Sequence, residues 1–140
     1  MAVGSVRICW SWAMKMGWLA IALGVMACPA IAIAGEADVV EAEVRAVGDG
    51  TYRFDVTVAH ADTGWDHYAN SWEVLAPDGT VLGTRVLHHP HVQEQPFTRS
   101  TTIAIPDEID RVIIRAGDSV HEFGGKTIEL DIPAEQPVTP

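Results

Sequence analysis

Sulfur, histidine and acidic residues are distributed very unevenly along this 140-residue chain, and their absences exclude several kinds of site. The first 34 residues contain no Asp, Glu or His, whereas residues 35–140 contain no cysteine and no methionine. The second part therefore cannot form a disulfide, an iron–sulfur centre or a cysteine-based structural zinc site. The missing thiolates and thioethers also argue against copper(I), which prefers soft sulfur ligands.

Basic residues are also scarce, with nine Lys and Arg against 19 Asp and Glu and a formal net charge of −10. This acidity argues against binding to nucleic acid, whose phosphates require Lys and Arg. The length allows one ordinary domain and excludes large barrels, doubly wound enzymes and solenoid arrays. The hydrophobic fraction of 48% is typical of a globular domain rather than a disordered chain.

The amino-terminal segment has the pattern of a secretory signal peptide. Arg7 and Lys15 are the only charged side chains before Glu36, and an apolar run over residues 16–27 follows them. The small-x-small sequence Ala32-Ile33-Ala34 then predicts cleavage after Ala34. Residues 1–34 are therefore interpreted as a signal peptide, and the processed protein as periplasmic or secreted.

Three alternatives for this segment stay open. The sequence Val25-Met26-Ala27-Cys28 loosely resembles a bacterial lipobox, which would attach a lipid to Cys28 and hold the protein at a membrane. The 19 residues of 16–34 approach the length of a membrane span, so an uncleaved anchor is a second alternative. Met14 is an alternative start that would give a signal of more ordinary length.

Short runs of alternating apolar and polar residues, separated by turn residues, predict an all-β domain over residues 35–132. Seven such runs in about 100 residues favour a seven-stranded antiparallel β-sandwich of immunoglobulin-like or fibronectin-III-like type. Residues 133–140 contain three prolines and are predicted to form a flexible tail. The seven predicted strands are 40–46, 52–58, 71–76, 80–87, 97–105, 111–116 and 127–132.

The six histidines all fall in alternate links between these strands. In an up-and-down succession, the links 59–70, 88–96 and 117–126 share one end of the domain, and the short turns 48–51, 77–79 and 106–110 share the other. Long polar loops gathered at one end of a rigid scaffold are typical of a binding site. The histidines of the first end are His60, His67, His88, His89, His91 and His121.

Imidazole is the commonest metal-binding side chain, and it suits copper(II), zinc and nickel. All six histidines are therefore candidate ligands for a divalent transition metal, with copper(II) or zinc the leading candidates. His89 and His91 flank Pro90 and would point the same way in an extended segment. Neighbouring residues in the same loops are candidates for supporting the imidazoles or contacting a partner: Asp62, Trp65, Asp66, Tyr68, Glu94 and Asp118.

Three segments resemble a family of small secreted proteobacterial proteins of uncharacterised function: Thr63-Gly64-Trp65-Asp66-His67-Tyr68-Ala69, residues 89–100 (HPHVQEQPFTRS), and Asp118-Ser119-Val120-His121. The resemblance implies export and a single domain, and it implies no activity, substrate or cofactor.

A metal-free alternative uses the same loops. Trp65 and the histidines would then recognise a periplasmic protein or a glycan, and the imidazoles would make that contact sensitive to pH. An enzyme would need an open metal position and a general base. Glu94 and Asp66 have the right chemistry, but nothing in the sequence selects either one, so a non-enzymatic binding protein is predicted.

Overall fold

The computed structural model describes residues 35–134, so the predicted signal peptide and residues 135–140 of the predicted tail lie outside the described residues. The described chain is all-β and contains no helix that could span a membrane. Its seven strands are β1 (Asp38–Gly48), β2 (Thr51–Ala59), β3 (Ala69–Leu75), β4 (Val81–Val86), β5 (Phe97–Ala104), β6 (Arg111–Asp118) and β7 (Ile128–Asp131). The predicted all-β class and the number of strands are confirmed.

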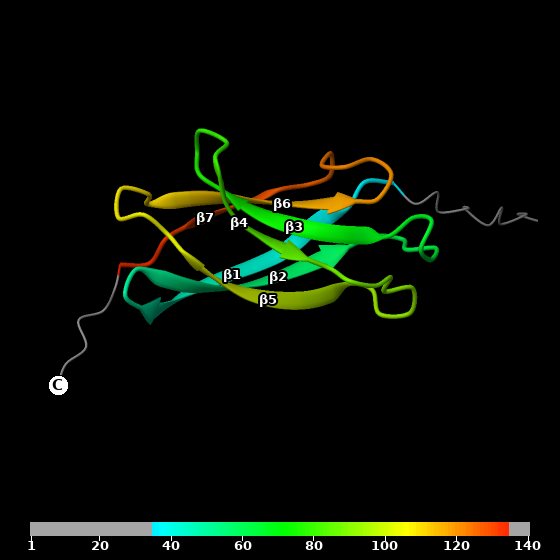
Figure 1. Ribbon diagram of the computed structural model, residues 1–140, viewed down its shortest axis with the longest axis horizontal. Helices are drawn as coiled ribbons and strands as arrows, with labels where there is room; N and C mark the ends of the chain where they lie inside the picture. Colours follow the sequence, from blue (N-terminus) through cyan, green and yellow to red (C-terminus); the bar gives the residue numbers. More distant parts are fainter. Residues whose placement is uncertain (1–34, 135–140) are drawn as a thin grey trace, which may run out of the picture. The chain divides into compact units, whose positions relative to one another are not determined.

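The strands form two antiparallel sheets with the orders β1–β2–β5 and β4–β3–β6–β7 (Figure 1). The predicted hairpin of the first two strands is present as the β1–β2 pair, closed by Gly48, Asp49 and Gly50. Gly79 has a φ of 90° in the turn between β3 and β4, a conformation that side chains with a Cβ rarely adopt. The turn residues thus fix which strands pair.

One hydrophobic core takes side chains from both sheets. Alternate residues of β2, including Phe54 and Val56, are fully buried, as are Trp72 on β3 and Ile114 on β6. These strands form because their apolar residues recur with the period of two that places them on one face. Burial of this shared face provides the main stabilisation of a domain that has no disulfide.

The run predicted over 40–46 alternates apolar residues from Val40 onward, which would place Val40 on the same face as Ala42 and Val44. The structure departs from this alternation at Val40, which is 48% exposed, whereas Val39 is buried. The pairing register shifts between Val39 and Glu41, so Val40 is the extra residue of a β-bulge. Beyond the bulge, Ala42 and Val44 pack against the core as expected.

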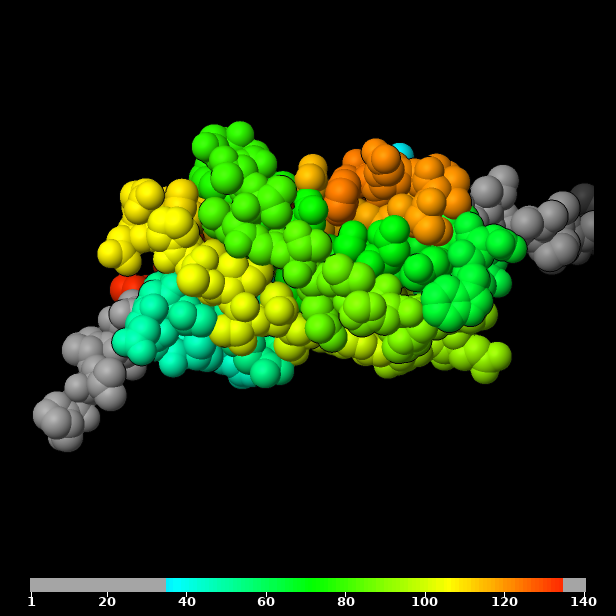
Figure 2. All heavy atoms as spheres, viewed as in Figure 1, coloured from blue at the N-terminus to red at the C-terminus, as the bar shows by residue number. Residues whose placement is uncertain are grey.

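The connections differ at the two ends of the sheets. Short turns join β1 to β2, β3 to β4 and β5 to β6 at one end, and longer loops over 60–68, 87–96 and 119–127 lie together at the other (Figure 1). In the space-filling view the three longer loops make one continuous surface, coloured green, yellow-green and orange (Figure 2). We call this end the loop end and the opposite one the turn end.

Candidate metal centre

His60 is the first functional side chain at the loop end, and β2 places it. It continues the inward row of Tyr52, Phe54, Val56 and Val58 by one more step of two, so its side chain is directed inward and is fully buried. Its backbone N–H donates to Oε1 of Gln95 at 3.0 Å. The ring is therefore fixed from both the strand and the facing loop.

Asp62 orients the His60 ring. The distance from His60 Nδ1 to Asp62 Oδ1 is 2.5 Å, and the Asp62 side chain is fully buried. Asp62 Oδ1 also accepts the backbone N–H of Ala69 at 3.0 Å, and Oδ2 accepts that of His91 at 2.6 Å. A carboxylate at Nδ1 fixes the tautomer that leaves Nε2 with a free lone pair, which is the arrangement behind many metal-binding histidines.

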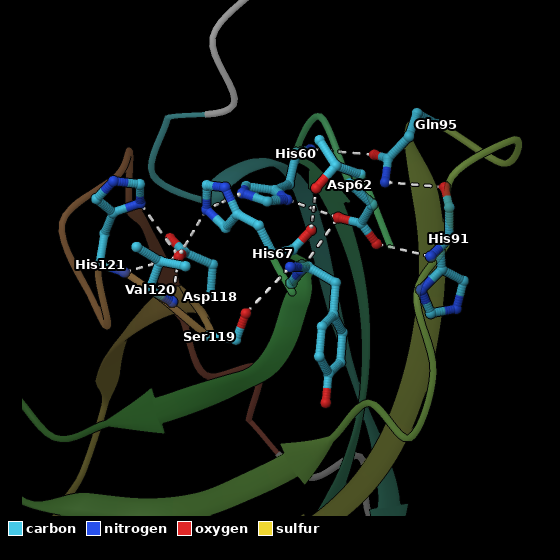
Figure 3. A network of polar contacts seen from close by, with 12 residues as sticks. His60, Asp62, His67, His91, Gln95, Asp118, Ser119, Val120 and His121 are labelled. Carbon is cyan, nitrogen blue, oxygen red and sulfur yellow. Dashed lines mark hydrogen bonds and ion pairs between the residues drawn. The ribbon is translucent and has the colours of Figure 1, made fainter. Parts of the chain in front are cut away.

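His67 presents its Nε2 to the same point from the loop over 60–68 (Figure 3). A tight reversal from Gly64 to His67 brings it there, and Gly64 has a φ of 139° that favours glycine. The Nε2 atoms of His60 and His67 lie 3.3 Å apart, and His67 Nε2 lies 3.1 Å from Oδ1 of Asp118.

Asp118 is the last residue of the inward row of β6, after Val112, Ile114 and Ala116. Its side chain is fully buried, which by itself would raise its pKa. Backbone N–H groups of His121 and Val120 donate to Oδ1 at 2.8 and 2.9 Å and hold the pKa of Asp118 below its usual value. Oδ2 is buried and has no hydrogen-bond partner within residues 35–134. A buried, charged oxygen without a partner requires a physical explanation.

Together, His60, His67 and Asp118 have the geometry of a metal-ligand set. One ligand atom from each lies within 4.8 Å of the others. Zinc–nitrogen bonds of about 2.0–2.1 Å in a tetrahedron imply a spacing of about 3.3–3.4 Å between ligand atoms. The observed Nε2–Nε2 distance of 3.3 Å matches this spacing.

The charges of the buried side chains also favour a bound metal ion. Asp62 and Asp118 are both fully buried carboxylates, and their only ion-pair partners among the described residues are histidines. Buried carboxylates are costly unless a positive charge compensates them. A divalent cation bound among the three ligand atoms would supply such a charge.

His121 lies at the exposed side of the cluster. Its Nδ1 is 3.2 Å from Oδ1 of Asp118, and its ring centroid is 4.9 Å from that of His67. Its side chain is 39% exposed, and it does not belong to the group of three whose ligand atoms lie within 4.8 Å of one another. On the other side, an open pocket is lined by Glu36, Asp38 and the 59–62 segment, among other residues.

The remaining predicted ligands lie apart from this cluster. His88 and His89 are exposed, whereas His91 is buried with its ring stacked on Phe97. His91 reaches the cluster only through its backbone, by its bond to Asp62. The structure thus divides the six histidines into two groups, His60, His67 and His121 in one and His88, His89 and His91 in the other.

The predicted supporting residues are divided as well. Asp62 supports His60, and Asp118 lies among the ligand atoms themselves. Trp65 is 68% exposed, with the Tyr68 ring edge against it at a centroid distance of 5.6 Å. Asp66 is exposed, and Glu94 pairs with Arg99 at 2.9 Å.

Sequence reasoning missed Gln95, whose amide bonds to the backbone of both His60 and His91. No sequence signal identified it. For His60 and Asp118 a signal was present, because each adds one polar residue to an inward apolar row of period two. A polar residue at such a position is buried, and a buried polar residue requires a partner.

Comparison with known proteins adds one relative. The chain is 40% identical over 96 residues to a protein of Halomicrobium mukohataei named "Putative lipoprotein". The match covers 69% of this chain and 47% of the relative, so the chain spans about half the length of the protein that it matches. No family model and no solved structure matches the chain. None of these comparisons indicates an enzyme family, and the proteobacterial distribution stays a prediction.

Proposed function

We propose that this chain is an exported, non-enzymatic binding protein for a divalent transition-metal ion, copper(II), zinc or nickel. The proposed ligands are Nε2 of His60, Nε2 of His67 and a carboxylate oxygen of Asp118, with His121 as the fourth. The observation that carries the proposal is the pair of imidazole Nε2 atoms 3.3 Å apart beside a buried carboxylate with an unpartnered oxygen.

The donor set also bears on the metal. Nitrogen and carboxylate donors suit copper(II), zinc and nickel, and no sulfur donor exists in residues 35–140. The domain itself is proposed to be an immunoglobulin-like or fibronectin-III-like sandwich. This class is supported by the strand orders β1–β2–β5 and β4–β3–β6–β7 and by a core shared between the sheets.

Calorimetry tests the metal proposal. The untagged chain, as processed on export, is stripped with a chelator and titrated with copper(II), zinc and nickel separately. Replacing His67 by Ala removes one of three ligands and should weaken the tightest binding by about a hundredfold or more, beyond the roughly 10–100-fold typical of supporting residues. The matched control is His88→Ala, which removes an exposed histidine outside the cluster and should leave that binding unchanged. Equal affinity in wild type and His67→Ala would overturn the proposal.

A metal-free interaction module is the second candidate, and the exposure of Trp65 favours it. An aromatic side chain that is 68% exposed beside a second aromatic ring is the kind of surface that binds a sugar face or a protein partner. Replacing Trp65 by Ala would then abolish capture of the partner by chelator-stripped protein. Retention of the partner by this variant would exclude the module.

The name of the relative bears on where the protein resides. It favours the lipobox interpretation of residues 25–28, in which Cys28 carries a lipid, over cleavage after Ala34. Mass spectrometry of the processed protein distinguishes the two. A mature chain that begins at Gly35 supports a soluble exported protein, and a lipid-modified chain that begins at Cys28 supports a membrane-anchored one.

A further inference from the structure

The second group of histidines contains a buried imidazole with unmet bonding capacity. His91 is only 4% exposed, and its ring stacks on Phe97 with centroids 3.8 Å apart and an interplanar angle of 11°. Both ring nitrogens, Nδ1 and Nε2, are buried and have no hydrogen-bond partner among the residues that the structure describes. In Figure 3 the His91 ring lies apart from the rings of His60, His67 and His121.

Two unmet ring nitrogens are costly for a packing residue. An imidazole has a donor or acceptor function at each nitrogen, and leaving such a group buried and unsatisfied destabilises the fold. Burial lowers the pKa of His91, and the nearby Arg99 and His89 lower it further. The neutral imidazole is the form that binds a metal ion.

A second imidazole lies directly against it. The ring centroids of His89 and His91 are 4.5 Å apart, similar to the 4.7 Å between His60 and His67. His89 is exposed and precedes His91 by two residues across Pro90, which disfavours a helical backbone at His89. The His89 side chain therefore meets His91 from the solvent side, while the His91 ring is packed on Phe97.

A carboxylate belongs to the same turn. The backbone N–H of Glu94 donates to the carbonyl of His91 at 3.2 Å, which closes a turn over residues 91–94. The Glu94 carboxylate is exposed and pairs with Arg99. Hydrogen bonds from Arg99 lower the pKa of Glu94, whose carboxylate follows His91 by three residues in this turn.

We infer that His89 and His91 form a second site for a divalent transition-metal ion, with Glu94 of the same turn as the candidate carboxylate. The site is weaker than the His60–His67–Asp118 cluster because only two imidazoles and no buried carboxylate face the ion. Its backbone is held by Asp62 at the His91 N–H and by Gln95 at the His91 carbonyl. The inference goes beyond the proposed function and does not depend on it, because the two sites share no ligand.

The test separates the two sites by variants. In the untagged, chelator-stripped chain, calorimetric titration with copper(II) should show two binding events of different affinity. The double variant His60→Ala/His67→Ala should lose the tighter event and keep the weaker one. His91→Phe keeps the stacking on Phe97, removes both nitrogens, and should lose the weaker event while the tighter one stays within about twofold.

Controls keep the result interpretable. His89→Gln changes an exposed side chain and leaves the stacking of His91 on Phe97 intact, so it should lose the weaker event as His91→Phe does, even if His91→Phe folds poorly. His88→Ala removes the adjacent exposed histidine and should keep both events. Retention of the weaker event in both His89→Gln and His91→Phe, or its absence from wild type, would overturn the second site. Neither result bears on the tighter binding event. Absence of the tighter event from the wild-type protein would overturn the proposed function instead.

Discussion

The chain reverses between strands at both ends of the domain, but the polar groups of these connections lie on the surface at one end and in the interior at the other. At the turn end, Asp78 accepts the backbone N–H of Thr80 on the surface, and the connection needs only a few residues. At the loop end, Asp62 performs similar bonding in the interior, where it accepts the N–H groups of Ala69 and His91 and faces the His60 ring.

This difference distinguishes the polar groups that the fold needs to connect its strands from those that it does not need. Turns with exposed polar groups suffice to connect strands, as the turn end shows. Buried carboxylates and imidazoles add desolvation costs that a simple connection does not require. Polar groups that a fold does not need and that are costly to bury are often retained for binding or catalysis, which is why we propose the loop end as the functional end.

The largest effect on stability is expected from Asp62→Ala. The substitution leaves three buried donors unsatisfied, His60 Nδ1 and the N–H groups of Ala69 and His91, at about 1–3 kcal/mol each. Urea unfolding in the presence of chelator should show a loss of about 3 kcal/mol or more. Asp78→Ala is the matched change at the turn end and should lower stability much less. Equal losses of unfolding free energy in the two variants would show that the two ends do not differ in this way.

Metal binding should stabilise the protein by a similar but smaller amount. At a free metal concentration of a hundred times Kd, mass action adds about 2.7 kcal/mol. Tm should rise by roughly 10 °C or more, and hydrogen exchange should slow at residues 60–68 and 119–127 more than at the turn end. The Tm rise should disappear in His67→Ala. A rise of the same size in that variant would place the stabilising ion elsewhere.

A smaller effect is expected from Gly79→Ala. Because Gly79 has a φ of 90°, a Cβ at this position strains the turn and should cost about 1 kcal/mol. Metal affinity, measured by calorimetry, should not change. A metal affinity that falls together with stability would mean that the two ends are not independent.

The smallest effect concerns the pH dependence of the turn end. The backbone N–H of Thr80 lowers the pKa of Asp78 below its usual value. A lowered folded-state pKa contributes stability above the unfolded value, and this contribution is lost as the pH falls toward the folded one. Asp78→Asn should therefore flatten the acid limb of the stability curve slightly below about pH 4. Unfolding curves from pH 2 to 7 measure this, and an unchanged acid limb would show that the turn bond is not formed in solution.

Much of the fold could be predicted from the sequence because each strand alternates and each turn uses residues suited to turns. The runs of Tyr52 to Val58 and of Arg111 to Ala116 identify their strands in this way. Assigning alternate links to one end of the domain also placed all six histidines at that end. The bulge at Val40 could not be predicted, since an extra residue in one strand depends on the partner strand rather than on local pattern.

The division of the histidines into two groups could not be predicted from the sequence, for a similar reason. In the sequence, His89 and His91 stand close together around Pro90, yet the three-ligand cluster joins His60, His67 and Asp118, which are up to 58 residues apart in the chain. Their convergence depends on how the ends of β2 and β6 face each other and on the tight reversal at Gly64. Distances of this kind come from packing, whereas the sequence shows only which residue types are available.

The point at which the chain enters the domain has a practical consequence for handling the protein. Gly35, Glu36 and Asp38 line the same pocket as His60, whereas Ile132, just after β7, bonds to Asp110 at the turn end. A polyhistidine tag joined ahead of Gly35 would therefore lie beside the ligand cluster and compete with it for metal. Purification tags, fluorescent reporters and surface tethers belong at the carboxyl side, where the domain leaves its loop end free.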